Sequence, residues 1–421
     1  MCGARDTEPA SDVSLTSRAF YPGGIFFLCP GDFPFIMANI GLAVTRPSMA
    51  DQQRASDTVL LAARKSPGSA GRFPTLDGLR ALSILLVLLG HSNGTLNFPA
   101  VPLFGLYANF GVRVFFIISG FLITSLLLKE MERTARISLK DFYTRRVLRI
   151  FPAFYTFLLV VCALSLGGVI QLRPRDLWFA FTYLMNFHFD HSWHVGHLWS
   201  LAVEEQFYLL WPAVVAFCSR RRAFQVAAAV SIMSPFLRLT AYCLTPSLRQ
   251  GIGHMFPTVA DALAIGCFLA GTRDWLHAQT WYKRLLEPRN FAVIAVAAVL
   301  ANLLQDWPRI YMAFGESIMN VGIAICIDRC MTFESGRVGR ILEWRPLVFI
   351  GVLSYSLYIW QQLFLNRSSS ALVCTFPLNL ILVGLCALAS YYLVEQPFLR
   401  LKQHFSHSAS TGLAANSCGT T

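Results

Sequence analysis

Residues 104–128 read FGLYANFGVRVFFIISGFLITSLLL, a stretch in which Arg113 is the one charged residue. Apolar stretches of similar length recur along most of the chain, long enough to cross about 30 Å of hydrocarbon. Hydrophobic residues make up 55% of the 421 residues and charged residues 14%, and the mean hydropathy is +0.51. Soluble globular chains carry about 25% charged residues. The expected solvent is therefore lipid, and the expected fold is an all-α polytopic membrane bundle.

The pattern predicts ten membrane-spanning helices. They are placed at residues 79–97, 104–128, 150–170, 199–218, 223–245, 254–272, 290–305, 310–328, 346–366 and 375–395. Residues 177–190 are also apolar but short, and a full crossing there would invert the orientation of every later loop. We therefore expect this segment to be re-entrant or interfacial.

The loops predict the orientation of the chain. Seven basic and three acidic residues in the loop 129–149 give a net charge of +4, and the segments 273–289 and 329–345 each carry +2. Ten crossings place these loops on one side, which the positive-inside rule makes cytoplasmic. We expect a multi-pass protein of the cell (inner) membrane with both termini in the cytoplasm. This distribution accounts for the net charge of +12 without nucleic acid.

The two ends differ from the membrane part in composition. We expect a poorly ordered extension at 1–70, a membrane domain at 71–402 and a disordered tail at 403–421, and translation could also begin at Met49. The eleven cysteines are scattered without a CxxC pair. We therefore predict neither a disulfide framework nor a zinc site.

Ionisable residues at membrane depth are costly, so they are the first candidates for function. Arg80 and His91 are eleven positions apart in the first span, about 16 Å along a helix. His91 is a candidate general base for a hydroxyl group; the alternative is a packed, hydrogen-bonded histidine. Glu204 lies at a similar depth and would orient the imidazole. Since Glu204 and Glu205 are adjacent, we expect one of them to face elsewhere.

A second group of candidates lies near the predicted cytoplasmic surface. Arg145, Arg146 and Arg149 form a candidate cradle for the phosphates of a donor, because a guanidinium matches phosphate oxygens in geometry; positive-inside bias is the alternative explanation. Ser119 and Gly120 would allow close approach of a ligand, or only of another helix.

His188, His191, His194 and His197 recur every third residue. A metal site is conceivable there, but a polar lip at the outer mouth is preferred and no metal is predicted.

Six stretches in a fixed order carry a resemblance to a known family. They are LDGLRAL at 76–82, followed by His91; GVRVFFIISGFLIT at 111–124; FYTRRVLRIFP at 142–152; HLWSLAVEEQFY at 197–208; SYSLYIW at 354–360; and EQPF at 395–398. Over about residues 73–402 the chain resembles the acyltransferase 3 family of membrane O-acyltransferases.

The resemblance implies an essential arginine, ten intervening residues and a histidine, which Arg80 and His91 match. It also implies ten spans, a cytoplasmic acyl-CoA donor such as acetyl-CoA, and a glycan or related acceptor. No permanently bound cofactor is expected. The chain departs from the family where Gln361 replaces a frequent histidine, where Val259 and Ala260 precede Asp261 in place of a frequent arginine, and where Gln396 replaces an arginine.

The sequence therefore predicts an O-acyltransferase in which His91 deprotonates an acceptor hydroxyl. The alternatives are a transporter or flippase, and a membrane protein without turnover. A transporter would favour internal repeats or paired broken helices, and the sequence shows neither. The acceptor, the acyl chain length, the oligomeric state and the route of the acyl group across the membrane are not given by the sequence.

Overall fold

The computed structural model describes residues 73–401. The predictions for 1–70, for Met49 and for 403–421 lie outside the described residues. The helices are α3 Pro74–Ser92, α4 Pro102–Thr134, α5 Leu139–Leu166, α6 Pro174–Phe181, α7 Trp193–Gly196, α8 Leu198–Phe217, α9 Arg220–Leu244, α10 Phe256–Ala278, α11 Thr280–Leu285, α12 Pro288–Asn302, α13 Pro308–Ile310, α14 Glu316–Thr332, α15 Arg337–Leu342, α16 Arg345–Val352, α17 Ser354–Phe364 and α18 Leu378–Ala389. Within residues 73–401 there is no strand, so the all-α expectation is confirmed.

Each predicted span coincides with a helix or a helix pair, but the count of ten is not confirmed. Among the described residues seven helices are long and apolar enough to cross a membrane, or eight if α16 and α17 form one bent span. Helices α8 and α10 do not meet this criterion. Polar residues lower their mean hydropathy: Glu204, Glu205 and Gln206 in α8, and Asp261 in α10.

The segment 177–190 does not cross the membrane. It contains the end of the eight-residue helix α6 and a single 3₁₀ turn, Met185–Phe187. Eight residues rise about 12 Å, far less than the hydrocarbon thickness. The expectation that this segment makes no full crossing is confirmed.

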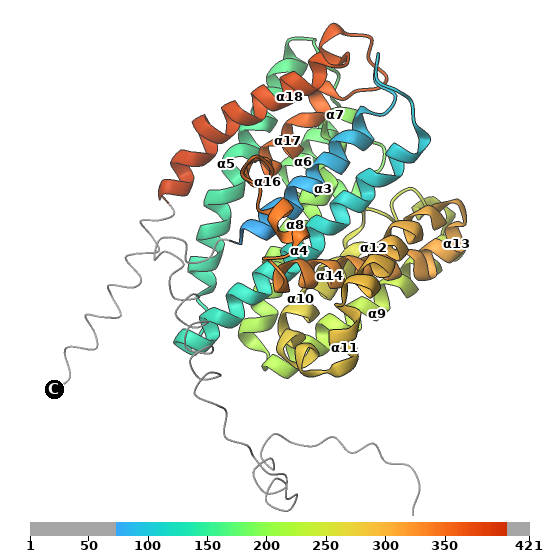
Figure 1. Ribbon diagram of the computed structural model, residues 1–421. Coiled ribbons are helices and arrows are strands. Elements are labelled where there is room, and N and C mark those ends of the chain that lie inside the picture. Colours follow the sequence, from blue (N-terminus) through green and yellow to red (C-terminus); the bar gives the residue numbers. More distant parts are fainter. Residues whose placement is uncertain (1–72, 402–421) are drawn as a thin grey trace, which may run out of the picture. The chain divides into compact units, whose positions relative to one another are not determined.

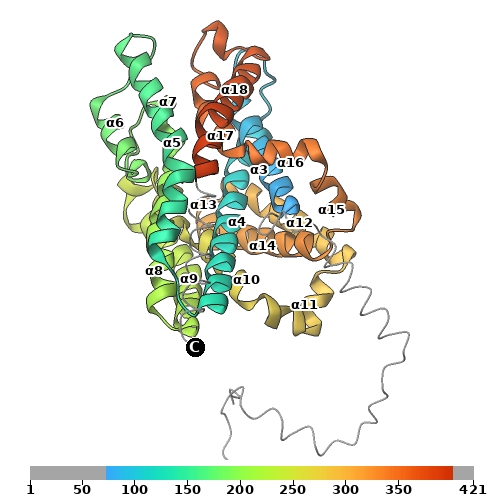
Figure 2. The same cartoon turned by 90° about the vertical axis from the view of Figure 1, so that its left-hand side faces the viewer.

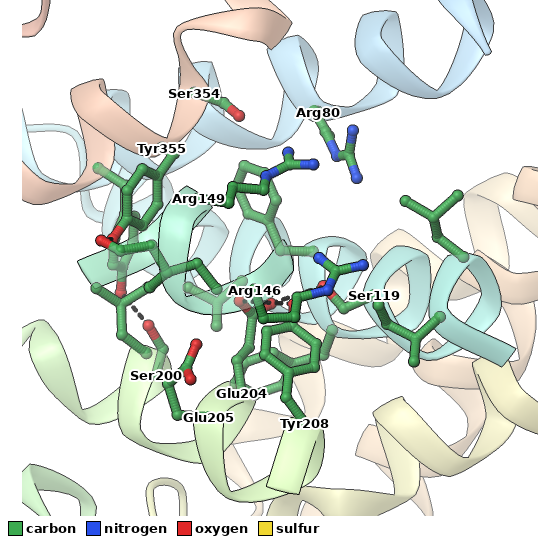
Figure 3. Close-up of a pocket in the computed structure, with 18 residues that line it drawn as sticks. Arg80, Ser119, Arg146, Arg149, Ser200, Glu204, Glu205, Tyr208, Ser354 and Tyr355 are labelled. Carbon is green, nitrogen blue, oxygen red and sulfur yellow. Dashed lines mark hydrogen bonds between the residues drawn. The ribbon is translucent and has the colours of Figure 1, made fainter. Parts of the chain in front are cut away.

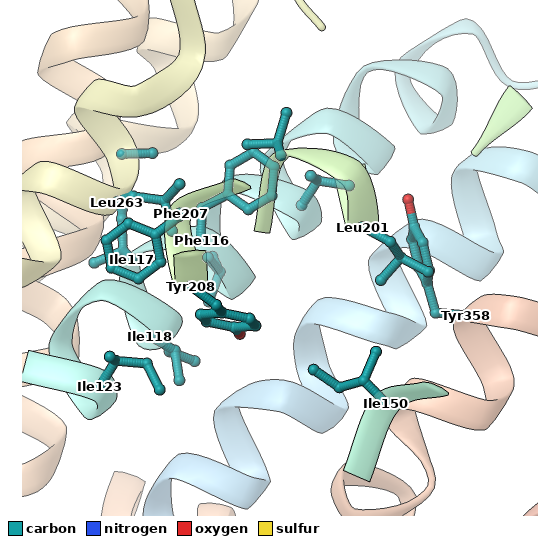
Figure 4. Close-up of a cluster of buried hydrophobic side chains, with 14 of the residues drawn as sticks. Phe116, Ile117, Ile118, Ile123, Ile150, Leu201, Phe207, Tyr208, Leu263 and Tyr358 are labelled. Atoms are coloured by element: carbon teal, nitrogen blue, oxygen red, sulfur yellow. The ribbon is translucent and has the colours of Figure 1, made fainter. Parts of the chain in front are cut away.

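Helix α4 lies at the centre of the bundle and packs along α3 and α10 (Figures 1 and 2). Of its most apolar 18-residue window 72% is buried within the protein, compared with 17% in α9 and in α12. The outer helices therefore present most of their apolar surface to lipid. The buried core gathers residues from α4, α5, α8, α10 and α17, including Phe116, Ile150, Leu201, Leu263 and Tyr358 (Figure 4).

The contact between α4 and α10 depends on two glycines. A Cβ atom on Gly120 would lie 2.0 Å from the carbonyl oxygen of Leu263, and one on Gly266 would lie 2.2 Å from that of Ile117. Each glycine therefore lets the opposite backbone approach at a distance that no side chain would permit. The predicted alternative for Gly120, helix packing, is what the structure shows.

Four buried charges join α4 to its neighbours. Arg113 Nη2 lies 2.7 Å from Glu316 Oε2, and Arg238 Nη1 lies 3.0 Å from Asp261 Oδ2 and 3.1 Å from Glu316 Oε2. Arg113 Nη1 lies 3.7 Å from Asp261 Oδ1. All four side chains are at most 2% exposed. This quartet, Arg113, Arg238, Asp261 and Glu316, is neutral as a whole and connects α4, α9, α10 and α14.

Helices α16 and α17 form a broken span. They are inclined by 68° at Leu353, where one continuous span was expected. Membrane proteins accept such breaks where the backbone is buried or lines a cavity. The break turns Ser354, Tyr355 and Tyr358 of α17 toward the interior of the bundle, where they line a cavity.

We expect Gly120→Ala to destabilise the protein by about 1–3 kcal/mol, because the new methyl group displaces the α10 backbone. Gly384→Ala is the matched control in α18, where no atom lies within 4 Å of an added Cβ. It should be neutral or slightly stabilising, as a helical glycine-to-alanine change usually is. Unfolding in mixed micelles measures both, and equal stabilities of the two variants would contradict the packing account.

Glu316→Gln should lower the free energy of unfolding by about 3–5 kcal/mol, because it leaves two buried arginines with one carboxylate. Asp190→Asn tests an ion pair of the opposite kind, since Arg173 and Asp190 are 61% and 84% exposed. That variant should unfold like the unaltered protein. A tolerated Glu316→Gln change would show that the quartet does not hold the bundle together.

Candidate functional site

A cavity with about 100 Å³ of interior space opens between α3, α4, α5, α8 and α17 (Figure 3). Its wall combines charged, hydroxyl and apolar groups. The lining residues are Arg80, Val112, Phe115, Phe116, Ser119, Leu122, Ile123, Arg146, Arg149, Ile150, Ser200, Leu201, Glu204, Glu205, Tyr208, Ser354, Tyr355 and Tyr358. Several of them belong to the stretches on which the sequence expectations were built.

Three arginines lie on one side of the cavity. Arg80 comes from α3, and Arg146 and Arg149 come from α5. Their guanidinium groups are close enough to repel one another. Arg80 is 3.2 Å from Asp77, whereas neither Arg146 nor Arg149 forms an ion pair with another described residue. Such a concentration of positive charge suits an anionic ligand with several oxygens, such as a phosphate.

The ring of Tyr208 holds one of these arginines in place. The Arg146 guanidinium lies 5.1 Å from the centre of the Tyr208 ring and 5.6 Å from that of Phe142. Contacts of a cation with two ring faces fix its position without neutralising its charge. Arg146 can therefore keep its hydrogen-bond donors for a ligand.

The structure brings two of the three arginines of the predicted phosphate cradle to the cavity. Arg146 and Arg149 line the cavity, but Arg145 does not, and it forms an ion pair of 3.3 Å with Glu130. Neighbouring positions of a helix differ by about 100° in direction, which separates Arg145 from Arg146. Gly120 also lies outside the lining, whereas Ser119 lies within it.

Glu204 is held by hydroxyl groups. Ser119 Oγ donates to Glu204 Oε1 at 2.8 Å, and the Tyr208 hydroxyl lies 3.4 Å from Glu204 Oε2 and 3.2 Å from Ser119 Oγ. Glu205 lines the same cavity. The expectation that the two adjacent glutamates face different sites is therefore wrong. The cavity is wide enough to receive side chains about 100° apart on α8.

The far side of the cavity carries two hydroxyl groups. Ser200 Oγ lies 2.6 Å from the Tyr358 hydroxyl, which also donates to the backbone carbonyl of His197 at 3.0 Å. Figure 3 shows Ser200 away from the three arginines. The cavity therefore carries polar groups on both of these sides, and Ser119, Glu204, Glu205 and Tyr208 line it together with apolar side chains.

His91 does not line this cavity. Its Nδ1 lies 2.9 Å from Oε1 of Gln361, and its ring packs against Trp193 with 5.9 Å between ring centres. The expected pairing of His91 with Glu204 is not formed, since Gln361 occupies that position. The depth of two residues in a membrane can be read from a sequence, whereas the direction in which a helix turns its side chains cannot.

The partner of His91 is nevertheless one helical turn from a residue of the cavity. Tyr358, at the far side of the cavity, and Gln361, the partner of His91, are three positions apart on α17, a rise of about 4.5 Å. Arg80 lies in the second turn of α3 and His91 in its last turn. The helix thus places Arg80 in the cavity and His91 against Gln361 of α17.

The histidines of the outer loop have separate partners. His188 Nε2 lies 2.7 Å from Asp176 Oδ1, and the two ring nitrogens of His197 each lie 2.9 Å from an oxygen, one of Gln362 and one of Ile359. Within the part of the chain that the structure describes, no three His, Cys, Asp or Glu side chains converge as metal ligands would.

Several cavity residues were not singled out from the sequence. Tyr208, Ser200, Tyr355 and Tyr358 belong to the stretches at 197–208 and 354–360, but no role was assigned to them. Tyr208 was detectable, because it follows Glu204 by four positions and shares its helix face. Tyr355 and Tyr358 were not detectable in this way, because the direction of their side chains depends on the 68° bend between α16 and α17.

The family described as "Acyltransferase domain" matches residues 73–395. The O-acetyltransferase OatA of Staphylococcus aureus is 30% identical over 77% of this chain and 57% of its own length. A putative peptidoglycan O-acetyltransferase, YrhL, of Bacillus subtilis is 28% identical, and the peptidoglycan O-acetyltransferase OatA of Listeria monocytogenes is 26% identical, each over 77% of this chain and 54% of its own length. The chain thus spans little more than half the length of these relatives. No solved structure gives a significant match.

Proposed function

Because the chain belongs to the acyltransferase-domain family, we propose that it transfers an acetyl group from acetyl-CoA to a hydroxyl group of a cell-surface glycan. The single observation that carries this proposal is the cavity with Arg80, Arg146 and Arg149 at one side and Tyr358 at the other, one helical turn from Gln361, which holds His91. The relatives named for peptidoglycan O-acetylation support an acetyl group and a glycan acceptor.

The proposed donor site uses both ends of the cavity. The three arginines bind the phosphates of acetyl-CoA, and the apolar walls accommodate its extended arm. The acetyl thioester then lies toward Ser200 and Tyr358. The basic segment 129–149, predicted to be cytoplasmic, includes the arginine-bearing end of α5, where a cytoplasmic donor would enter.

The proposed reaction is a direct acyl transfer. Nε2 of His91 accepts the proton of the acceptor hydroxyl, and the oxygen forms a bond to the thioester carbonyl carbon. The C–S bond breaks, and the proton is returned to the departing sulfur. The products are the acetyl ester and free CoA. In this scheme Glu204, held by Ser119 and Tyr208, balances the arginine charge rather than orienting His91.

The alternative of a transporter or flippase has less support. Transporters place pairs of broken helices in corresponding halves of the chain. In the described residues there is one bent pair, α16 and α17, and no counterpart. The bend serves the enzyme proposal directly, because it brings the residues of α17 to both the cavity and His91.

His91→Ala should lower the rate of acetyl transfer by about 10²–10⁴-fold, the usual contribution of a general base. The measurement compares surface glycans by mass spectrometry in cells with the unaltered protein, without it and with the variant. The control is His277→Ala, because Asp328 keeps Arg273 and Tyr282 as partners when His277 is removed. Normal acetylation by an inserted His91→Ala protein would eliminate the proposed mechanism.

Arg146→Ala should raise the KM for acetyl-CoA by about 10- to 100-fold, the cost of losing a charged hydrogen bond. Arg145→Ala is the adjacent control, because Arg145 pairs with Glu130 outside the cavity. Initial rates at varied acetyl-CoA and saturating glycan give the KM for acetyl-CoA of each variant. Equal effects of the two substitutions would remove the cavity from donor binding and leave only the general positive charge of this surface.

A further inference from the structure

Gln361 is fully buried and holds the imidazole of His91. It belongs to α17 and is 0% exposed. Its Oε1 lies 2.9 Å from Nδ1 of His91. An amide oxygen can only accept a hydrogen bond, so Nδ1 carries the proton in this contact. In the neutral imidazole the lone pair then lies on Nε2.

A second glutamine of α17, Gln362, also contacts a histidine, and the comparison shows what distinguishes His91. Gln362 contacts His197 in the same manner, with 2.9 Å between Oε1 and Nδ1, but Nε2 of His197 is also engaged, by the carbonyl of Ile359. His197 is 2% exposed, whereas His91 is half-buried. No hydrogen bond from a described residue reaches Nε2 of His91.

The ring of His91 is also held from a second side. Trp193 of α7 packs edge-on against it, with planes inclined by 80°, and Arg367 lies 5.4 Å above the Trp193 ring. Contacts from α7 and α17 together define both the position and the rotation of the imidazole. One nitrogen is bound and the other remains available to a substrate.

We propose that Gln361 is a positioning residue that holds His91 as the Nδ1–H tautomer and directs Nε2 to the acceptor hydroxyl. This inference rests on the proposed function of His91. A neutral amide suits the position, because it orients the ring and stabilises the protonated form less than a carboxylate would. It also avoids a further charge inside the membrane.

The test compares Gln361→Leu, Gln361→Glu and Gln362→Leu, assayed with acetyl-CoA and soluble peptidoglycan fragments and normalised to folded protein. Gln361→Leu removes the oxygen that fixes the tautomer, so kcat should fall by roughly 10²–10⁴-fold. The KM values should change by less than about twofold, since no substrate contact is lost. Gln362→Leu should leave kcat per folded molecule unchanged.

Gln361→Glu separates positioning from packing, because it keeps the size of the side chain and the accepting oxygen. It should recover most of the rate at high pH. The carboxylate stabilises the protonated imidazole, so activity should be lost at a higher pH than in the unaltered enzyme as the pH falls. The charged or titratable groups acting on His91, Arg367 and His197, are the same in both proteins.

The outcomes are distinguishable. Full activity of Gln361→Leu together with an inactive His91→Ala protein would overturn this inference and leave the proposed function intact. An active His91→Ala protein would overturn both. If Gln361→Leu does not fold, an unshifted pH profile of Gln361→Glu would still overturn the inference, because a purely structural glutamine would not change it.

Discussion

Every charge that this chain carries into the bundle must find a partner there, because hydrocarbon does not solvate it. The quartet of Arg113, Arg238, Asp261 and Glu316 satisfies this requirement across four helices. It fixes the rotation of α4 about its own axis, since Arg113 can meet its carboxylates in only one orientation. With that rotation fixed, Ser119 of α4 faces the cavity and Gly120 faces α10.

The cavity is the place where charge is not fully paired. Arg146 and Arg149 form no ion pair among the described residues, although Glu204 and Glu205 line the same cavity, whereas the buried Arg113 and Arg238 each form one. A site that concentrates positive charge in an apolar surrounding has a strong preference for an anion. The second part of the broken span, α17, contributes Tyr358 to the cavity and, one helical turn further on, Gln361, which holds His91.

Much of this arrangement follows from the sequence, and the remainder shows what a sequence omits. The helices and the cavity residues Arg80 and Arg146 were predicted, because length, hydropathy and charge are properties of single segments. The partner of His91 was not predicted correctly. The sequence indicates the depth of Glu204 in the membrane, but it does not indicate the rotation of the helices, which brings Gln361 to His91 instead. The 68° bend between α16 and α17 was not predicted either, because no single residue in this stretch indicates it.

A structure of the protein with a non-hydrolysable acetyl-CoA analogue would test the central claim most directly, since that claim is that one cavity joins a donor site to His91. The account predicts the phosphates of the analogue against Arg80, Arg146 and Arg149, its arm along the cavity, and its acyl end between Tyr358 and His91. Phosphates bound elsewhere, or an acyl end that stays on the arginine side, would contradict it.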